Sequence, residues 1–163
     1  QRFGIPFECH IPDIDESRKQ NESPVELAER LADEKAASIC KDHPGAIVIG
    51  SDQLAVFENN VLGKPGNYEA ALRQLSAFSG RTMEFLTAVS VQCHASGFRE
   101  VHIDTTHVRF RELEPMEITR YLDAEKPFDC AGAFKAESLG ITLFESIKSE
   151  VNALMRQYPI FKM

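Results

Sequence analysis

The sequence predicts a fold of the α/β class, in which helices flank one mixed, twisted sheet. Two observations support this prediction. Apolar residues recur with helical spacing in three segments, and the segments between them show the short apolar runs or the alternation typical of strands. No internal repeat, low-complexity tract or linker interrupts this order, so we expect a single domain over residues 1–163.

The N-terminal part of the chain predicts a strand, a loop and a helix in that order. Residues 5–11 have strand character, and the polar stretch 12–22 is typical of a loop. The clearest helix falls within residues 23–45. Ser23 is placed to cap its first turn, and Glu26, three residues later, completes a capping box. A Pro–Gly pair closes the segment.

Residues 46–50, AIVIG, predict a short central strand covered on both faces, because the run is apolar without interruption. Asp52 follows almost at once. We therefore expect it in a loop at the carboxyl end of this strand, where open α/β sheets bind ligands.

Residues 54–64 predict a hairpin that turns at Asn59-Asn60, because asparagine tolerates positive φ. With that turn, Lys64 lies opposite residue 55. Asp52 is three residues further along, about 10 Å away at ~3.3 Å per residue. The two side chains could then contact opposite ends of one phosphate ester, or both could be ordinary surface residues.

The rest of the chain predicts two helices and a β-rich region. Asn67 is placed to cap a helix, and two long alternating segments are joined in hairpin fashion. The expected elements are helices at 68–79 and 114–126, strands at 82–94 and 100–113, and strand and turn structure at 129–148.

The composition excludes several classes of protein. The net charge of −7 argues against broad binding to nucleic acid or anionic membranes, because both favour a basic face. No apolar run approaches the roughly eighteen residues of a membrane span, and no signal peptide is visible. The four cysteines lie far apart, without a CxxC pair, which indicates reduced thiols. We therefore expect a cytoplasmic protein.

Two further groups of charged residues have open interpretations. Lys35 lies on the first predicted helix with Arg30 and Glu34, which could simply form a solvated face with i,i+4 ion pairs. Three carboxylates crowd the preceding loop, at Asp13, Asp15 and Glu16, where they could hold Mg²⁺ or remain solvated. No glycine-rich phosphate loop, dinucleotide fingerprint or nucleophile elbow is present.

Several short motifs, in matching order, resemble the Maf family of nucleoside triphosphate pyrophosphatases. They are IDES, ERLADEKA, IVIGSDQ, GKP and AGAFKAESLGITLFESI, and the similarity covers about residues 3–150. SDQ followed by FKAESLGI is similar to the subgroup associated with 7-methyl-GTP. The family's N-terminal Ser-x-Ser-x-x-Arg motif and its final helix have no counterpart here, so we expect a Maf-like domain in which these two parts are missing.

The resemblance implies a two-lobed, Maf- and ITPase-like architecture with the nucleotide in a central cleft. It also implies metal-dependent hydrolysis between the α- and β-phosphates, with Mg²⁺ or Mn²⁺ as cofactor. Asp52 would be the proton acceptor, and Lys35 and Lys64 would neutralise the phosphates. Glu16 would be a further polar group that shares the metal with Asp52.

Gln53 and Glu137 match the family's specificity positions. A carboxylate suits guanine, which presents N1–H and N2–H₂ donors, and it also favours the positive charge of a 7-methylguanine base. Two other readings stay open at this point: a Maf enzyme with another preferred base, and a non-catalytic, nucleotide-binding regulator of cell division. Family members are often homodimers, which makes a second copy of the chain a candidate partner; nucleic acid and membrane are not expected.

Overall fold

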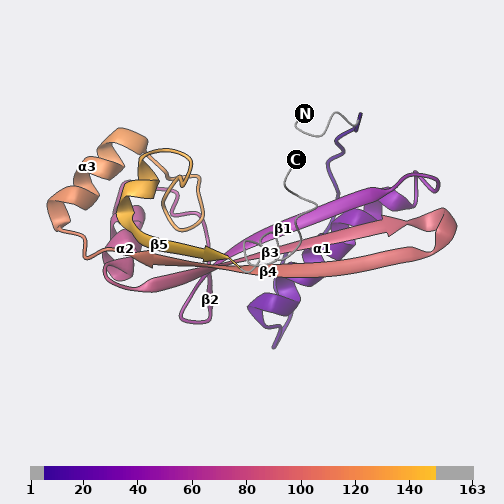
Figure 1. The fold of residues 1–163 in the computed structure, drawn as a ribbon, viewed down its shortest axis with the longest axis horizontal. Coiled ribbons are helices and arrows are strands. Elements are labelled where there is room, and N and C mark those ends of the chain that lie inside the picture. Colours follow the sequence, from indigo (N-terminus) through magenta and orange to yellow (C-terminus); the bar gives the residue numbers. More distant parts are fainter. Residues whose placement is uncertain (1–5, 150–163) are drawn as a thin grey trace, which may run out of the picture.

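The computed structural model describes residues 6–149, which form one long five-stranded sheet with three α-helices (Figure 1). The strand order is β2-β1-β3-β4-β5. The helices are α1 (Pro24–Cys40), α2 (Tyr68–Phe78) and α3 (Pro115–Glu125), and the strands are β1 (Val48–Phe57), β2 (Asn60–Leu62), β3 (Thr82–Cys93), β4 (Phe98–Phe110) and β5 (Phe144–Ser149). The predicted α/β class is confirmed.

Within the described residues the sheet is antiparallel throughout, not mixed as predicted. The connections explain the difference. A hairpin joins β3 directly to β4, and β1 reaches β3 through the β2 hairpin and α2, so no parallel crossover unit forms between neighbouring strands.

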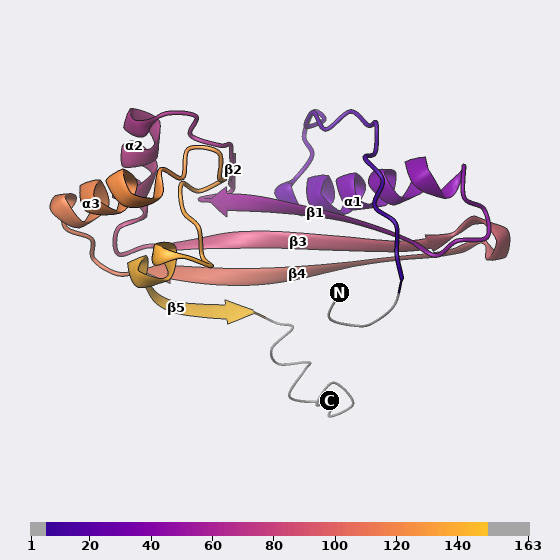
Figure 2. The ribbon, with the colours of Figure 1, turned by 90° about the horizontal axis from the view of Figure 1, so that it is seen from above.

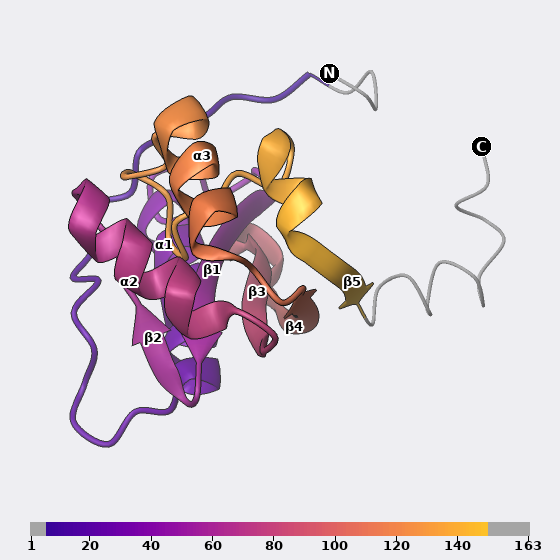
Figure 3. The same ribbon diagram turned by 90° about the vertical axis from the view of Figure 1, so that its left-hand side faces the viewer.

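The helices gather in two places along the sheet, which gives the molecule two lobes. Helix α1 lies along one half of the long strands, whereas α2 and α3 lie at the other end (Figure 2). Figure 3 looks onto that second end, with α2 and α3 toward the viewer. The two-lobed arrangement expected from the resemblance is therefore present.

Each lobe covers a different face of the same strands. On β3, Met83 joins the buried cluster under α2 and α3, while Leu86 and Ala88 join a second cluster with α1. Side chains alternate between the faces of a strand, so this odd-to-even change shows that the covered face switches between residues 83 and 86.

The predicted N-terminal caps of α1 and α2 are both present. Ser23 Oγ accepts from the Glu26 amide at 3.2 Å, and Glu26 Oε2 accepts from the Ser23 amide at 2.8 Å, which completes the predicted capping box. Asn67 Oδ1 accepts from the Ala70 amide at 2.9 Å and caps α2 as expected.

The prediction for β1 was wrong in its end and in its burial. The strand runs seven residues beyond Gly50, and Asp52 lies within it, paired with Ala88 of β3. The polar residues after Gly50 break the apolar run. The strand continues because hydrogen bonds to β3 satisfy its backbone groups, whatever the side chains are. Ile47 and Ile49 are exposed, so this segment is covered on one face only within the described residues.

The hairpin is confirmed, but its turn lies one residue earlier than predicted. Glu58 and Asn59 have positive φ (49° and 63°), as in a type I′ turn, and Leu62 pairs with Ala55. Glu58 in the turn also forms an ion pair with Arg81. Lys64 therefore does not lie opposite residue 55 but follows the end of β2.

Three other expectations concern the ends and composition of the chain. Residues 6–11 form no strand within the described structure, while residue 5 and the segment 151–163 lie outside the described residues. The four cysteines are free thiols. No helix in residues 6–149 is both long and apolar enough to cross a membrane.

Candidate active site

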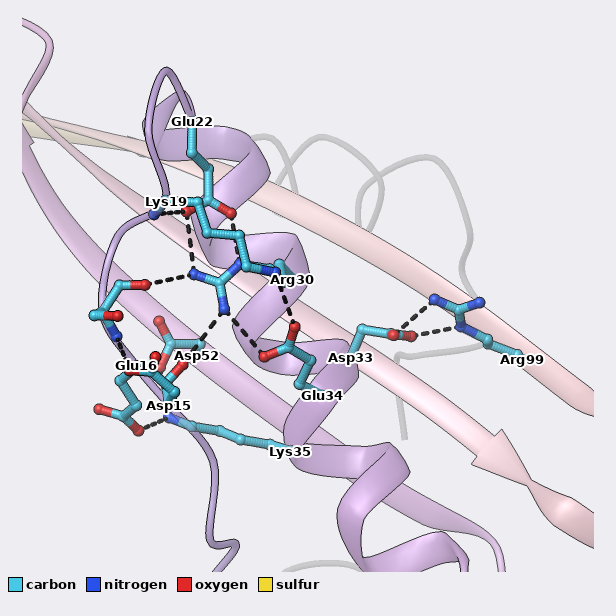
Figure 4. Close-up of polar contacts among 11 residues, drawn as sticks. Asp15, Glu16, Lys19, Glu22, Arg30, Asp33, Glu34, Lys35, Asp52 and Arg99 are labelled. Carbon is cyan, nitrogen blue, oxygen red and sulfur yellow. Dashed lines mark hydrogen bonds and ion pairs between the residues drawn. The ribbon is translucent and has the colours of Figure 1, made fainter.

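Lys35 joins two predicted site carboxylates from different parts of the chain. Its Nζ lies 2.7 Å from Oδ1 of Asp52 on β1 and 2.8 Å from Oε1 of Glu16 in the loop before α1 (Figure 4). The structure thus brings together three of the residues that the family resemblance selects.

Gly50 brings α1 close enough to β1 for this contact. A Cβ at residue 50 would lie 2.4 Å from the carbonyl oxygen of Ala32 and 2.6 Å from the amide nitrogen of Ala36, both in the backbone of α1. Asp52 is two residues further along the strand, so its side chain points to the same face and meets Lys35 from the helix.

The cluster is largely withdrawn from solvent on the sheet side. The side chains of Lys35 and Asp52 are 18% and 12% exposed, whereas that of Glu16 is 61% exposed. Burial acts to lower the pKa of Lys35, but the hydrogen bonds and charges of Asp52 and Glu16 outweigh it, so the pKa lies above its ordinary value. Lys35 is therefore a cation at neutral pH.

Oδ2 of Asp52 is buried and has no hydrogen-bond partner among the described residues. Buried carboxylate oxygens are normally satisfied, because an unmade bond costs about 1–3 kcal/mol. Oδ2 is thus an acceptor of the cluster that the described residues leave unused.

The donor set fits a hard divalent cation shared with a substrate. Within residues 6–149 no three His, Cys, Asp or Glu side chains are grouped so as to form a metal cage. Mg²⁺, however, commonly uses only one or two carboxylates together with substrate phosphates. The carboxylates of Asp52 and Glu16 could supply those ligands.

Gln53 and Glu137, the two expected specificity residues, line one cavity of about 360 Å³. Gln53 follows Asp52 directly, so it points to the opposite face of β1. Its Nε2 donates to Oγ1 of Thr87 at 2.7 Å. The other lining residues are mostly apolar or aromatic, with one lysine: they include Ala55, Phe85, Val108, Phe134, Lys135 and Phe144.

Asp52 and Gln53, which point to opposite faces of β1, both lie in the part of this strand that β2 does not cover. Strand β2 pairs with β1 only at residues 55–57, so residues 48–54 form an edge within the described structure. A ligand that extends from the cavity to the Lys35 cluster would cross this edge at Asp52 and Gln53.

A larger cavity, of about 840 Å³, adjoins the cluster on its other side. It lies between residues 6–12, α1 and β1, and both Lys35 and Ser51 line it. The rings of His10 and His43, which also line it, have centroids 4.7 Å apart. There is thus room beside Lys35 for a group larger than a single water.

Lys64 stands apart from the other predicted residues. It is exposed in the loop between β2 and α2, and within the described residues it forms no ion pair with Asp52 or Glu16. Sequence reasoning did not single out Thr87, whose contact with Gln53 depends on the β1–β3 register. It also did not single out Lys135, although this lysine lies in the same motif as Glu137.

Comparison with known proteins identifies relatives of this chain. Residues 1–155 match the model of a family described as Maf-like protein. The 7-methyl-GTP pyrophosphatase of Alcanivorax borkumensis is 52% identical over 90% of this chain and 75% of its own length. Proteins of the same name from Pseudomonas syringae pv. syringae and Polaromonas sp. are 43% and 45% identical, each over 99% of this chain and over 84% and 74% of their own lengths. The chain belongs to the Maf family.

Proposed function

We propose that this chain hydrolyses 7-methyl-GTP to 7-methyl-GMP and pyrophosphate. The observation that carries the proposal is the orphaned Oδ2 of Asp52 beside the Lys35 cation, next in the chain to Gln53, which lines a cavity together with Glu137. The names of the relatives, at 42–52% identity, support the same substrate.

Asp52 has the role of general base in this proposal. Its Oδ1 is held by Lys35, which leaves Oδ2 to accept a proton from water. The water oxygen forms a bond to the α-phosphorus as the bond from that phosphorus to the bridging oxygen breaks. Pyrophosphate leaves with the bridging oxygen, and the proton from water stays on Asp52.

The two lysines neutralise the phosphates. Lys35, whose pKa is raised, stays charged and contacts the phosphates from α1. Lys64 is proposed to approach the outer phosphates from its exposed loop. Asp52 and Glu16 would hold Mg²⁺ or Mn²⁺, which supplies, when bound, charge neutralisation of the triphosphate.

The cavity on the other face of β1 is the proposed site of the base. Phe85, Phe134 and Phe144 offer aromatic surface to a flat ring. Glu137 accepts from the guanine N–H donors, and its negative charge favours the positive charge of the 7-methylated base. Gln53 supplies a further polar contact.

The test is pyrophosphate release, with Mg²⁺ or Mn²⁺, from 7-methyl-GTP, GTP, ITP, dTTP and UTP. We expect a preference for 7-methyl-GTP. Asp52→Asn should lower kcat by about 10²–10⁴-fold, the usual contribution of a general base. Glu137→Gln should instead reduce the preference over GTP. Asp33→Asn is the matched control, because Asp33 lies on α1 but pairs with Arg99, away from the cluster.

Other outcomes would separate the remaining candidates. Strong turnover of dTTP or UTP would keep the enzyme and overturn the substrate. Release that survives Asp52→Asn would overturn the role of Asp52. Absence of release from every nucleotide, with tight binding of one of them, would favour a non-catalytic, nucleotide-binding regulator.

A further inference from the structure

Glu16 reaches the Lys35 cluster from a loop that has no regular secondary structure. Residues 12–22 contain neither helix nor strand, and the Glu16 side chain is mostly exposed. A surface ion pair of this kind is weak by itself, because an exposed chain loses conformational entropy when it is held in one place. Something else must hold the 12–22 loop if Glu16 is to stay beside Lys35.

Arg30 of α1 contacts this loop on both sides of Glu16. Its guanidinium donates to the carbonyl oxygens of Asp15, at 3.4 Å, and Ser17, at 2.9 Å. It also donates to both carboxylate oxygens of Glu22, at 2.5 and 3.1 Å (Figure 4). One side chain thus binds the loop immediately before and after Glu16 and again at its far end.

The remaining contact anchors the guanidinium to its own helix. It donates to Oε2 of Glu34 at 3.0 Å. The side chains of Arg30 and Glu22 are only 14% and 8% exposed, so this network is shielded far more than a typical surface pair. The hydrogen bond from Arg30 is the main reason that the pKa of Glu22 is lowered to about 2, so Glu22 stays ionised in acid that would protonate an ordinary glutamate.

We propose that Arg30 is a positioning residue, which holds the 12–22 loop on α1 so that Glu16 stays beside Lys35 and Asp52. This role rests on the proposed pyrophosphatase function. Arginine suits the role because its planar fork offers several donors in fixed directions, whereas lysine offers one point charge. Arg30 acts through Glu16 and does not itself touch the substrate.

The first test measures the loop without using activity. Trypsin cleaves after Arg18 and Lys19, both in the 12–22 loop. Cleavage of a locally opened segment follows the open population, so Arg30→Ala should speed cleavage at these sites by about tenfold or more. Arg99→Ala is the matched control. It removes an arginine fork from Asp33 on the same helix, at 2.6 and 2.7 Å, and should leave loop cleavage unchanged.

The second test is a double-mutant cycle on 7-methyl-GTP turnover with Glu16→Gln. If Arg30 acts through Glu16, Arg30→Ala lowers kcat in the wild-type background but changes it by less than about twofold when Glu16 is already replaced. Arg30→Lys should restore only part of the kcat lost in Arg30→Ala, since lysine keeps the positive charge but lacks the planar set of donors. A purely structural role predicts equal losses in both backgrounds.

Glu22→Gln is a second way to release the loop if Arg30→Ala does not fold. It removes the negative charge and one of the two oxygens that accept from Arg30, and it leaves α1 intact. Unchanged trypsin cleavage in these variants would overturn the proposal. So would a fold-decrease in kcat from Arg30→Ala that is the same with and without Glu16→Gln. If the wild type releases no pyrophosphate, the proposed function fails, while the trypsin result still decides whether Arg30 holds the loop.

Discussion

Asp52 and Gln53 are neighbours in the chain, yet they point to opposite faces of β1. Asp52 meets Lys35 under α1, and Gln53 enters the cavity that holds Glu137. Because the edge of the sheet lies between the two sites, one extended ligand can contact both residues without crossing a layer of backbone. In the proposed function, consecutive residues would therefore serve the phosphates and the base.

At the same scale, Thr87 should control base recognition through Gln53. Nε2 of Gln53 donates to the Thr87 hydroxyl, which leaves the amide oxygen as an acceptor for the base. Thr87→Val removes this anchor while keeping the shape of the side chain. We expect KM for 7-methyl-GTP to rise about 5- to 10-fold, as for the loss of one hydrogen bond, with kcat nearly unchanged.

Steady-state kinetics on 7-methyl-GTP and GTP measure this effect. Thr105→Val is the control, since Thr105 lies on the neighbouring strand β4 and faces away from the cavity. An equal rise in KM for Thr105→Val, or a fall in kcat in place of the rise in KM, would contradict the proposed anchoring of Gln53.

The sequence predicted the candidate site unevenly, for reasons that residues 30 and 52 illustrate. The family resemblance selected Asp52, but periodicity alone placed it in a loop, because a polar stretch within a strand looks like a strand end. Arg30 was read only as an i,i+4 partner of Glu34, and that pair is present. Its contacts with Glu22, eight residues earlier, depend on the path of a loop that no local pattern specifies.

At the scale of elements, the helix caps and the two hairpins were predicted correctly, whereas the register of the β1–β2 turn and the pairing of β1 with β3 were not. The caps at Ser23 and Asn67 each satisfy an amide three residues away, so the sequence contains the whole interaction. The β1–β2 turn depends on which residues can adopt positive φ, and the Asn59-Asn60 pair favoured the wrong position by one. The pairing of β1 with β3 joins residues more than 25 apart, which no short pattern records.

The contact between α1 and β1 gives a prediction at this scale. Gly50→Ala would place a methyl group against the backbone of α1, which cannot rotate away as a side chain can. We expect a loss of about 1–3 kcal/mol in the free energy of unfolding, measured by urea denaturation, together with reduced turnover as Lys35 shifts.

Gly45→Ala provides the comparison for this change. A Cβ there would meet nothing within 4 Å, so the free energy of unfolding should change by less than about 0.5 kcal/mol. Wild-type stability in Gly50→Ala would show that α1 can move away from β1, and the close approach would then not be needed to hold Lys35 at Asp52.

For the molecule as a whole, the two lobes share strands but not cores. The cluster under α1 and the cluster under α2 and α3 occupy opposite faces of β1 and β3. The sheet keeps their relative positions, and the proposed phosphate and base sites lie where the covered face changes. A chain with a net charge of −7 binds a polyanion at this junction only with local cations such as Lys35.

This arrangement predicts that one nucleotide protects both lobes at once. In hydrogen–deuterium exchange, a 7-methyl-GTP analogue with a methylene bridge between the α- and β-phosphates should slow exchange in residues 13–22 and in residues 130–137. At about 100 times the Kd, exchange through openings that release the ligand should slow by up to about 100-fold. The far end of the β3–β4 hairpin, at residues 94–98, serves as the internal control and should not change.

Pyrophosphate alone should protect only residues 13–22, and 7-methylguanosine only residues 130–137. Protection by the analogue in one lobe alone would show that the Lys35 cluster and the Glu137 cavity do not bind the same molecule, since a ligand that crosses the β1 edge must contact both.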